Sequence, residues 1–242
     1  MISVANVFKY FGLTPALKNV SFEIQKGEIV GFLGPNGAGK TTLMRILTSY
    51  LPATSGRVSV ADYDLGTQAL AARQKTGYLP ERPALYPEMR VESYLKFAAQ
   101  LKGVEGRHVA RQVDRVIEEC QIRDVRRQVI ATLSQGYRQR VGIAQAIVHD
   151  PEVLILDEPT TGLDPLQIIQ VRRLITNLER KRTVILSTHI LSEIEQIAKR
   201  VLIIKKGEIV ADQNLTELLN LDGRAQKLED VFLELTREEA LP

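Results

Sequence analysis

The chain has 242 residues, 44% of them hydrophobic and 25% charged, enough to bury the core of one large domain or of two lobes. Its formal net charge of +3 gives no reason to expect a nucleic-acid partner, and its single cysteine excludes an intrachain disulfide and a multi-cysteine metal site. No apolar run approaches the ~18 residues of a membrane span, and the N-terminus lacks the features of a signal peptide. We therefore expect a cytoplasmic chain that reaches a membrane only through a partner.

The first part of the chain predicts strands that lead to a glycine-rich loop. Residues 2–7 and 20–24 alternate apolar and polar side chains, and residues 27–33 read as a buried strand. Between the first two segments lie Tyr10 and Phe11. An aromatic side chain at this place is either an ordinary core residue of a strand or a ring that stacks on a planar ligand, and the residues alone leave both interpretations open.

Residues 34–41 read Gly-Pro-Asn-Gly-Ala-Gly-Lys-Thr, which is the spacing of a phosphate-binding P-loop. Glycines let successive backbone N–H groups curl round a triphosphate, while Lys40 reaches the β- and γ-phosphates and the Thr41 hydroxyl ligates Mg²⁺. Apolar residues at helical spacing follow the loop: Leu43, Ile46, Leu47, Tyr50 and Leu51. A strand, a loop and a helix in this order favour a nucleotide site over a glycine turn that binds nothing.

The middle of the chain changes to helical patterning. Strands at 56–61 and 77–81 and a short helix at 68–75 precede about sixty residues, roughly 91–150, whose apolar positions have helical spacing. One helix face is expected to consist of Tyr94, Phe97, Ala98 and Leu101. Cys120 falls among the apolar positions of this segment and is expected to be buried or half-buried. The pattern predicts a helical lobe inserted into an α/β lobe.

Residues 151–159 carry the second motif. Four consecutive apolar residues predict a strand buried on both faces of a parallel sheet, and Asp157 and Glu158 stand at its carboxyl end, where such sheets bind ligands. Beside a P-loop, Asp157 can hold Mg²⁺ and Glu158 can orient and polarise a water molecule. The alternative is a carboxylate pair at a helix start before Pro159.

A further buried strand is predicted at 183–189, after a helix that starts near residues 163–165. It ends in His189, which would therefore lie at the same sheet edge as Glu158. A lone histidine is often structural, so the residues by themselves leave a structural and a functional role open.

The last segments predict a hairpin over 201–211 and a helix at the C-terminal end. The helix is expected from four apolar residues at helical spacing: Leu228, Val231, Phe232 and Leu235. It either packs on its own domain or offers a surface to a partner.

Together these motifs resemble the nucleotide-binding subunit of ATP-binding-cassette (ABC) transporters over about residues 2–220. The resemblance rests on five segments in order: the P-loop, Leu133-Ser134-Gln135-Gly136-Tyr137, the strand with Asp157-Glu158, Gly162-Leu163-Asp164, and His189. It implies an α/β fold of the P-loop NTPase class, with a RecA-like core sheet and an N-terminal antiparallel β subdomain. A helical subdomain would be inserted at about 88–150, and residues 221–242 would form a C-terminal helical tail.

The resemblance also implies site roles. Phe11 rather than Tyr10 would stack on adenine, Glu158 would be the general base, and His189 would contact the γ-phosphate. The phosphates would be wrapped by Asn36, Gly37, Ala38, Gly39, Lys40, Thr41 and Thr42. Mg²⁺ would be held by Thr41, Asp157 and Glu81.

The family implies a homodimer. Ser134, Gln135 and Gly136 would open a helix whose positive end faces the ATP held by a second copy, and Asp164 would lie at the dimer seam. Two departures from the family pattern stand out: Glu81 replaces the usual glutamine and adds charge at the metal, and Gln135 and Tyr137 replace the usual glycine and glutamine. Because Ser134 and Gly136 are kept, we expect activity to survive.

The segments at 77–81, 133–140 and 228–232 are similar to those of ATPases paired with ABC-2-type exporter permeases, within the gliding-motility and drug- or sodium-export branch. The expected function is a motor subunit, peripheral at the cytoplasmic face, that drives a membrane permease. The alternatives are an ABC ATPase with a non-transport task and a small-molecule phosphotransferase.

Overall fold

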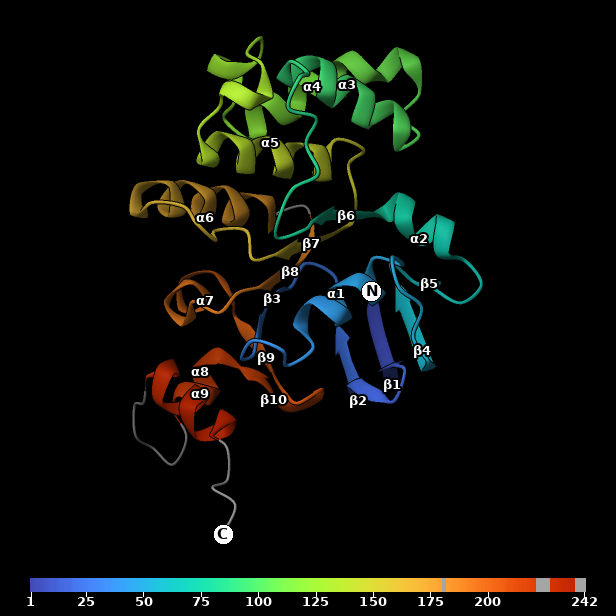
Figure 1. The fold of residues 1–242 in the computed structure, drawn as a ribbon, viewed down its shortest axis with the longest axis vertical. Coiled ribbons are helices and arrows are strands. Elements are labelled where there is room, and N and C mark those ends of the chain that lie inside the picture. The colour runs from blue at the N-terminus through green and yellow to red at the C-terminus, as the bar shows by residue number, and fades with distance from the viewer. Residues whose placement is uncertain (180–181, 221–226, 238–242) are drawn as a thin grey trace.

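The strands form two sheets whose order brings distant motifs together (Figure 1). The computed structural model describes residues 1–179, 182–220 and 227–237. The first sheet has the order β2-β1-β4-β5 and is antiparallel throughout. Its strands are β1 Ile2–Phe11, β2 Thr14–Ile24, β4 Ser55–Val60 and β5 Tyr63–Asp64.

The second sheet has the order β10-β9-β3-β8-β7-β6, and all its pairs are parallel except the edge pair of β9 and β10. Its strands are β3 Ile29–Leu33, β6 Thr76–Leu79, β7 Val153–Asp157, β8 Thr183–Ser187, β9 Arg200–Lys205 and β10 Glu208–Asn214. Every residue of β3, β7 and β8 is buried, because this sheet is covered on both faces. The predicted hairpin of β9 and β10 is confirmed.

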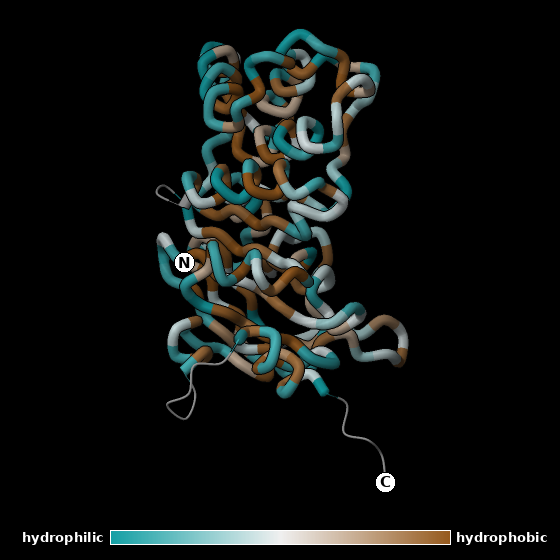
Figure 2. The backbone as a smooth tube through the Cα atoms, turned by 90° about the vertical axis from the view of Figure 1, so that its left-hand side faces the viewer, coloured by the Kyte–Doolittle hydropathy of each residue, from teal (hydrophilic) through white to brown (hydrophobic). Residues whose placement is uncertain are grey.

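Two layers of helices and strands enclose the second sheet. On one face, α1 (Lys40–Leu47) fills the space toward the antiparallel sheet, and the side chains between them form one apolar core. On the other face a second core joins the sheet to most of the remaining helices. In Figure 2 the most apolar backbone runs through the middle of the molecule.

Eight further α-helices are described after α1. They are α2 Ala69–Lys75, α3 Val91–Leu101, α4 Gly106–Glu119, α5 Gln135–Ile147, α6 Pro165–Glu179, α7 Leu191–Ile197, α8 Leu215–Leu219 and α9 Leu228–Thr236, with short 3₁₀ turns at Arg123–Val125 and Ile130–Thr132. The helices α3, α4 and α5 form the end of the molecule opposite α8 and α9 (Figure 1). Cys120 is fully buried there, as predicted.

Two predicted helices differ from the structure: one ends earlier than predicted, and the other buries only part of its predicted apolar face. The helix after the P-loop stops at Leu47 because Ser49 adopts a positive φ of 56°, and the N–H groups of Tyr50 and Leu51 both donate to the Arg45 carbonyl. Tyr50 is therefore 74% exposed. On α3, Tyr94 and Ala98 are buried, but Phe97 and Leu101 lie on the exposed side.

The C-terminal helix α9 packs on the body of the protein. Leu228 and Val231 are buried in the same core as α7 and α8, whereas Leu233 is exposed. Of the predicted tail at 221–242, residues 221–226 and 238–242 lie outside the described residues. Within the described ranges, no helix is long and apolar enough to cross a membrane.

Candidate functional site

The glycine-rich loop runs from the end of β3 into α1, so its backbone N–H groups surround the N-terminus of a helix. Gly39 caps this helix with φ 111°, and a Cβ placed on it would lie 2.7 Å from the carbonyl oxygen of Ala16. Conformation and space both require glycine at this position. At Gly34, a Cβ would lie 2.5 Å from the Ile204 carbonyl oxygen.

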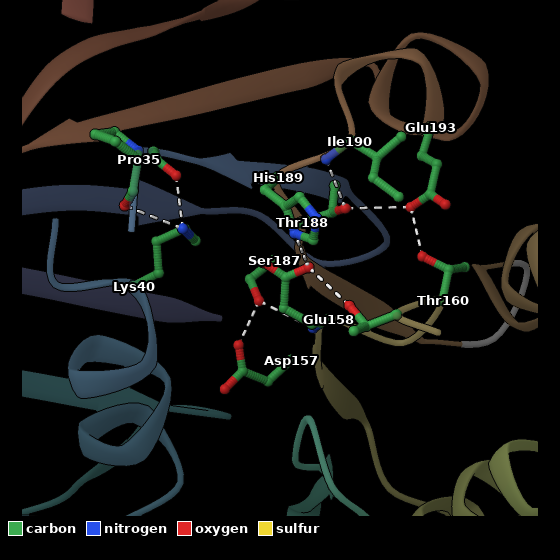
Figure 3. A network of polar contacts seen from close by, with 12 residues as sticks. Pro35, Lys40, Asp157, Glu158, Thr160, Ser187, Thr188, His189, Ile190 and Glu193 are labelled. Atoms are coloured by element: carbon green, nitrogen blue, oxygen red, sulfur yellow. Dashed lines mark hydrogen bonds and ion pairs between the residues drawn. The ribbon is translucent and has the colours of Figure 1, made fainter. Parts of the chain in front are cut away.

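Lys40 begins α1, and only 7% of it is exposed. Its Nζ atom donates to the carbonyl oxygens of Gly34 at 2.6 Å and Pro35 at 3.2 Å (Figure 3). Burial lowers the pKa of Lys40, and the negative charges of Glu158 and Asp157 oppose this effect. The cation thus lies folded back on its own loop, near two carboxylates, where phosphate oxygens could replace the loop carbonyls.

A cavity of about 320 Å³ lies in front of the loop. Its walls are formed by Ala16, Asn36, Gly37, Gly39, Lys40, Thr41, Thr42, Glu81, Glu158, Thr161 and His189. These residues come from the antiparallel sheet, the P-loop, the end of β6 and the ends of β7 and β8. Most of the side chains singled out in the sequence therefore meet at one place.

Asp157 ends β7 and lies behind this cavity with 1% exposure. Its Oδ1 atom accepts a hydrogen bond from the hydroxyl of Ser187, the last residue of the neighbouring strand β8. Burial raises the pKa of Asp157, and Glu158 and Glu81 add to this effect, while hydrogen bonds from Ser187 and Thr41 oppose it.

Glu158 and His189 face each other across the ends of β7 and β8. The His189 Nδ1 atom lies 2.7 Å from Glu158 Oε2, which also accepts a hydrogen bond from the Thr161 hydroxyl at 3.2 Å (Figure 3). The Glu158 side chain is 11% exposed and that of His189 is 53% exposed. Glu158 has a positive φ of 51°, held by its N–H group, which donates to the Ser187 carbonyl at 3.0 Å. The turn thus aims a carboxylate into the cavity.

The oxygen donors of the site fit Mg²⁺. Thr41 hydrogen-bonds to the Asp157 carboxylate, and the Glu81 carboxylate lies close enough to raise the Asp157 pKa. Among the described residues, no group of three acidic, histidine or cysteine side chains could hold a metal by itself. Mg²⁺ usually takes one or two carboxylates from the protein and completes its shell with phosphate oxygens and water, so two carboxylates and one hydroxyl are a suitable donor set.

Phe11 is not among the residues that line the cavity. It ends β1, is 50% exposed, and has the Lys9 ammonium 5.3 Å from its ring centroid. Half of Phe11 is thus open to a ligand, although the ring is not part of the cavity wall.

The segment 134–136 lies elsewhere, at the N-terminus of α5. Ser134 caps the helix by accepting from the Tyr137 N–H group, and the Gln135 side chain donates to the Thr161 carbonyl at 3.3 Å. A Cβ on Gly136 would lie 2.6 Å from the side chain of Gln167. The described chain therefore places these residues against segment 161–167 and not among the walls of the P-loop cavity.

Sequence reasoning missed three residues of the site. Ala16 and Thr161 line the cavity, and Ser187 holds Asp157. Asp164, which the resemblance assigns to a dimer seam, accepts a hydrogen bond from the Gln167 N–H group. Ser187 could have been found, since it precedes His189 in the polar end of a buried strand. Ala16 has no side-chain signal, because it reaches the site through the folding of β2.

A family model described as "ABC transporter" matches residues 17–161. Among curated proteins, the uncharacterised ABC transporter ATP-binding protein YxlF of Bacillus subtilis is 38% identical over 90% of this chain and 72% of its own length. The linearmycin resistance ATP-binding protein LnrL of Bacillus subtilis is 33% identical over 98% and 75%. The bacitracin transport ATP-binding protein BcrA of Bacillus licheniformis is 35% identical over 88% and 69%.

Solved structures show the same fold. An ATP-binding subunit of an ABC transporter superposes with a TM-score of 0.87 at 28% identity and covers 98% of this chain and 100% of its own. The dimeric cassette MJ0796 gives 0.80 at 26% identity, with 89% and 99% covered. CbiO1 of Clostridium perfringens, part of the complex cbiONQ, gives 0.83 at 26% identity, with 92% and 91% covered.

The P-loop, the two carboxylates and the histidine thus stand on a fold that is shared along nearly the whole chain. The chain belongs to the ABC transporter family as an ATP-binding subunit, and it is an ATPase. The predicted fold class, an α/β core sheet with an antiparallel sheet before it and helices inserted into it, is confirmed.

Proposed function

We propose that this chain hydrolyses ATP as the motor subunit of an ABC exporter. The observation that carries the proposal is the Glu158–His189 pair, 2.7 Å apart at the wall of the cavity that also holds Lys40. Lys40 and the loop residues 36–42 bind the phosphates. Glu158 acts as the general base that orients and polarises the attacking water, and His189 contacts the γ-phosphate.

Two further roles complete the proposed site. Thr41, Asp157 and Glu81 hold Mg²⁺, which when bound neutralises charge on the phosphates. Phe11 stacks on the adenine, supported by its exposed ring.

The proposed site is completed by a second copy of the chain. In support, Ser134, Gln135 and Gly136 do not line the P-loop cavity of their own chain, and the related cassette MJ0796 has a dimeric structure. The N-terminus of α5 would face the γ-phosphate held by the other protomer, with its positive dipole end toward the anion.

The proposed membrane partner is a separate permease. LnrL and BcrA are named for linearmycin resistance and bacitracin transport, which supports export. A groove of about 530 Å³ between the end of α1 and α3 is lined by exposed aromatic and apolar side chains, among them Tyr50, Tyr86 and Phe97, and also by Pro80. A permease segment seated there would adjoin Glu81, and the chain would then be peripheral at the inner face of the membrane.

Glu158→Gln is the direct test of the proposed base. The amide keeps the shape of the side chain but cannot accept a proton, so we expect turnover to fall by about 10²–10⁴-fold while MgATP still binds. Hydrolysis is measured as phosphate release and binding by calorimetry. Glu152→Gln, which changes an exposed carboxylate at the other end of the same strand, is the matched control. Near-normal turnover in Glu158→Gln would rule out Glu158 as the base.

Glu81→Gln tests the departure from the family pattern. If Glu81 adds a negative charge at the metal, its removal raises the Mg²⁺ concentration that gives half-maximal hydrolysis several-fold, while the ATP concentration dependence at saturating Mg²⁺ changes little. An unaltered Mg²⁺ dependence would place Glu81 outside the metal shell.

Two other functions predict different products or partners. A phosphotransferase would phosphorylate an added acceptor, whereas the motor yields only ADP and phosphate. An ABC ATPase with a non-transport task would purify without a multispanning membrane protein, whereas the exporter subunit brings one with it.

A further inference from the structure

Glu193 lies one turn beyond His189 in the chain and is only 2% exposed. Its Oε2 atom accepts two hydrogen bonds, from the hydroxyl of Thr160 at 2.7 Å and from that of Thr188 at 3.2 Å (Figure 3). Thr160 stands two residues after Glu158, and Thr188 stands directly before His189. One oxygen atom therefore joins the two loops that carry the catalytic pair.

Both hydroxyl donors of this network, those of Thr160 and Thr188, bond to Glu193. The Thr188 hydroxyl donates a hydrogen bond to Glu193 and accepts one from the N–H group of Ile190 at 3.0 Å. These two bonds fix the backbone on both sides of His189. The two threonines are also buried, with exposures of 2% for Thr160 and 0% for Thr188. Buried hydrogen bonds of this kind hold their partners in one geometry because no water can substitute for either group.

Burying the Glu193 carboxylate costs free energy of folding. Its other oxygen, Oε1, is buried and has no hydrogen-bond partner. An apolar side chain of similar volume would avoid the cost of burying a charged group that is only half satisfied. The feature that a hydrocarbon cannot supply is the double acceptor between the loops.

The two loops are thus joined by two bridges of different kinds. The outer bridge is direct, from His189 to Glu158, and lies at the cavity. In the proposed mechanism Glu158 orients a water and His189 meets a phosphate, so both side chains of the outer bridge take further partners. The inner bridge through Glu193 contains neither group, so it can persist while the outer side chains exchange partners.

We propose that Glu193 is a positioning residue for ATP hydrolysis, which holds the loops of Glu158 and His189 at a fixed spacing while these two side chains engage water and phosphate. This proposal rests on the roles given above to Glu158 and His189. It places the effect of Glu193 on the chemical step and not on ATP binding, because the P-loop does not belong to this network.

The test compares Glu193→Ala with Glu195→Ala in the full chain. Glu195 is an exposed residue on the same helix, and its Oε1 atom accepts from the Leu228 N–H group at the start of α9. It therefore controls for the loss of a hydrogen-bonded helix carboxylate outside the Thr160–Glu193–Thr188 network. We expect Glu193→Ala to lower kcat by about tenfold or more at saturating MgATP, because small misplacements of catalytic groups are costly, and to change ATP affinity less than about twofold. Glu195→Ala should leave both values near those of the native chain.

Conservative variants separate positioning from general damage. Glu193→Gln keeps an oxygen that can accept both hydroxyls, so it should restore most of the lost kcat. Thr160→Val and Thr188→Val remove one donor each, and combining either with Glu193→Ala should cost little more than Glu193→Ala alone. These valine variants test the same bridge if Glu193→Ala fails to fold.

Three results would overturn the proposal: an unchanged kcat in folded Glu193→Ala, a parallel loss of ATP affinity and kcat, or a Glu193→Gln variant as slow as Glu193→Ala. Glu158→Gln is assayed beside them. If it is inactive while the Glu193 and threonine variants are normal, only the inference about Glu193 fails; if it is active, the proposed base fails first.

Discussion

At the scale of single residues, the ends of β7 and β8 gather costly groups in a small space. Glu158 combines a positive φ with a nearly buried carboxylate, and Asp157 is a buried acid whose pKa is raised by that burial. Such strain persists because the fully buried strands on either side fix the backbone. The catalytic geometry is therefore a property of the sheet, with the loops only aiming the last side chain.

The lowered pKa of His149 predicts how the free energy of unfolding depends on pH. It follows α5, its Nε2 atom lies 3.1 Å from the Thr76 carbonyl oxygen, and its Nδ1 atom is buried without a partner. Burial lowers its pKa to about 3, helped by Lys102 and Arg115 and opposed by the Thr76 contact and Asp150. The unfolded chain takes up this proton near pH 6.5 and the folded chain does not, so stability is full above pH 6.5 and falls as the pH drops toward 3.

The expected slope from this one group is about 1.4 kcal/mol per pH unit between pH 6 and pH 4. In His149→Gln, which can still donate to the Thr76 carbonyl, that part of the slope should vanish. Urea unfolding at several pH values measures it. His108→Gln, at an exposed histidine, should keep the native slope. Equal slopes in native protein and His149→Gln would contradict the assignment.

At the scale of elements, the sequence predicted what periodicity and motif spacing control. The order of strands and helices around the P-loop, the buried strand before Asp157 and the closing hairpin follow from apolar runs and turn residues, and the structure has them. The end of α1 could not be predicted, because Tyr50 and Leu51 continue the helical spacing while Ser49 breaks the helix through its backbone conformation. A positive φ at serine has no sequence signal.

The candidate site also contains residues that motifs predict and residues that only the fold brings to it. Lys40, Glu81, Glu158 and His189 were all singled out from motifs, and all of them line one cavity. The contributions of Ala16 and Thr161 depend on how β2 and the turn after Glu158 fold against that cavity. Glu193 was invisible to motif reasoning, since a glutamate in a short helix normally faces water, and only the packing of α7 turns it inward.

The helix α9 yields a prediction about the tail. Leu228 is fully buried against the core and Leu233 is 55% exposed on the same helix. Leu228→Ala should lower the free energy of unfolding by about 2–5 kcal/mol, because it leaves a cavity, whereas Leu233→Ala should change it by less than about 0.5 kcal/mol. Urea denaturation of the full chain measures both. Equal, small effects would mean that α9 does not stabilise the ATPase body in solution.

At the scale of the whole molecule, the two segments proposed to form one ATP site stand on different parts of the chain. The P-loop cavity lies between the two sheets and the strand ends, while the N-terminus of α5 is turned toward segment 161–167. A dimer with twofold symmetry would bring each α5 to the other chain's P-loop, so that one dimer would hold two sites, each made by both chains. In this proposed dimer, ATP would be the bridge between subunits, and its hydrolysis would remove that bridge.

Mixing two inactive variants tests this arrangement. Lys40→Ala damages the P-loop half. Gly136→Asp crowds Gln167 and adds a negative charge at the N-terminus of α5, which the proposed dimer brings to the partner's γ-phosphate, so each variant alone should be inactive. Gly136→Asp should nevertheless bind ATP with near-native affinity as a monomer, because its P-loop is intact. In an equal mixture, half of the dimers combine both chains and contain one undamaged site, so about a quarter of the native phosphate release should return. A mixture that stays as inactive as its components, although native gel analysis shows mixed dimers, would mean that each chain completes its own site.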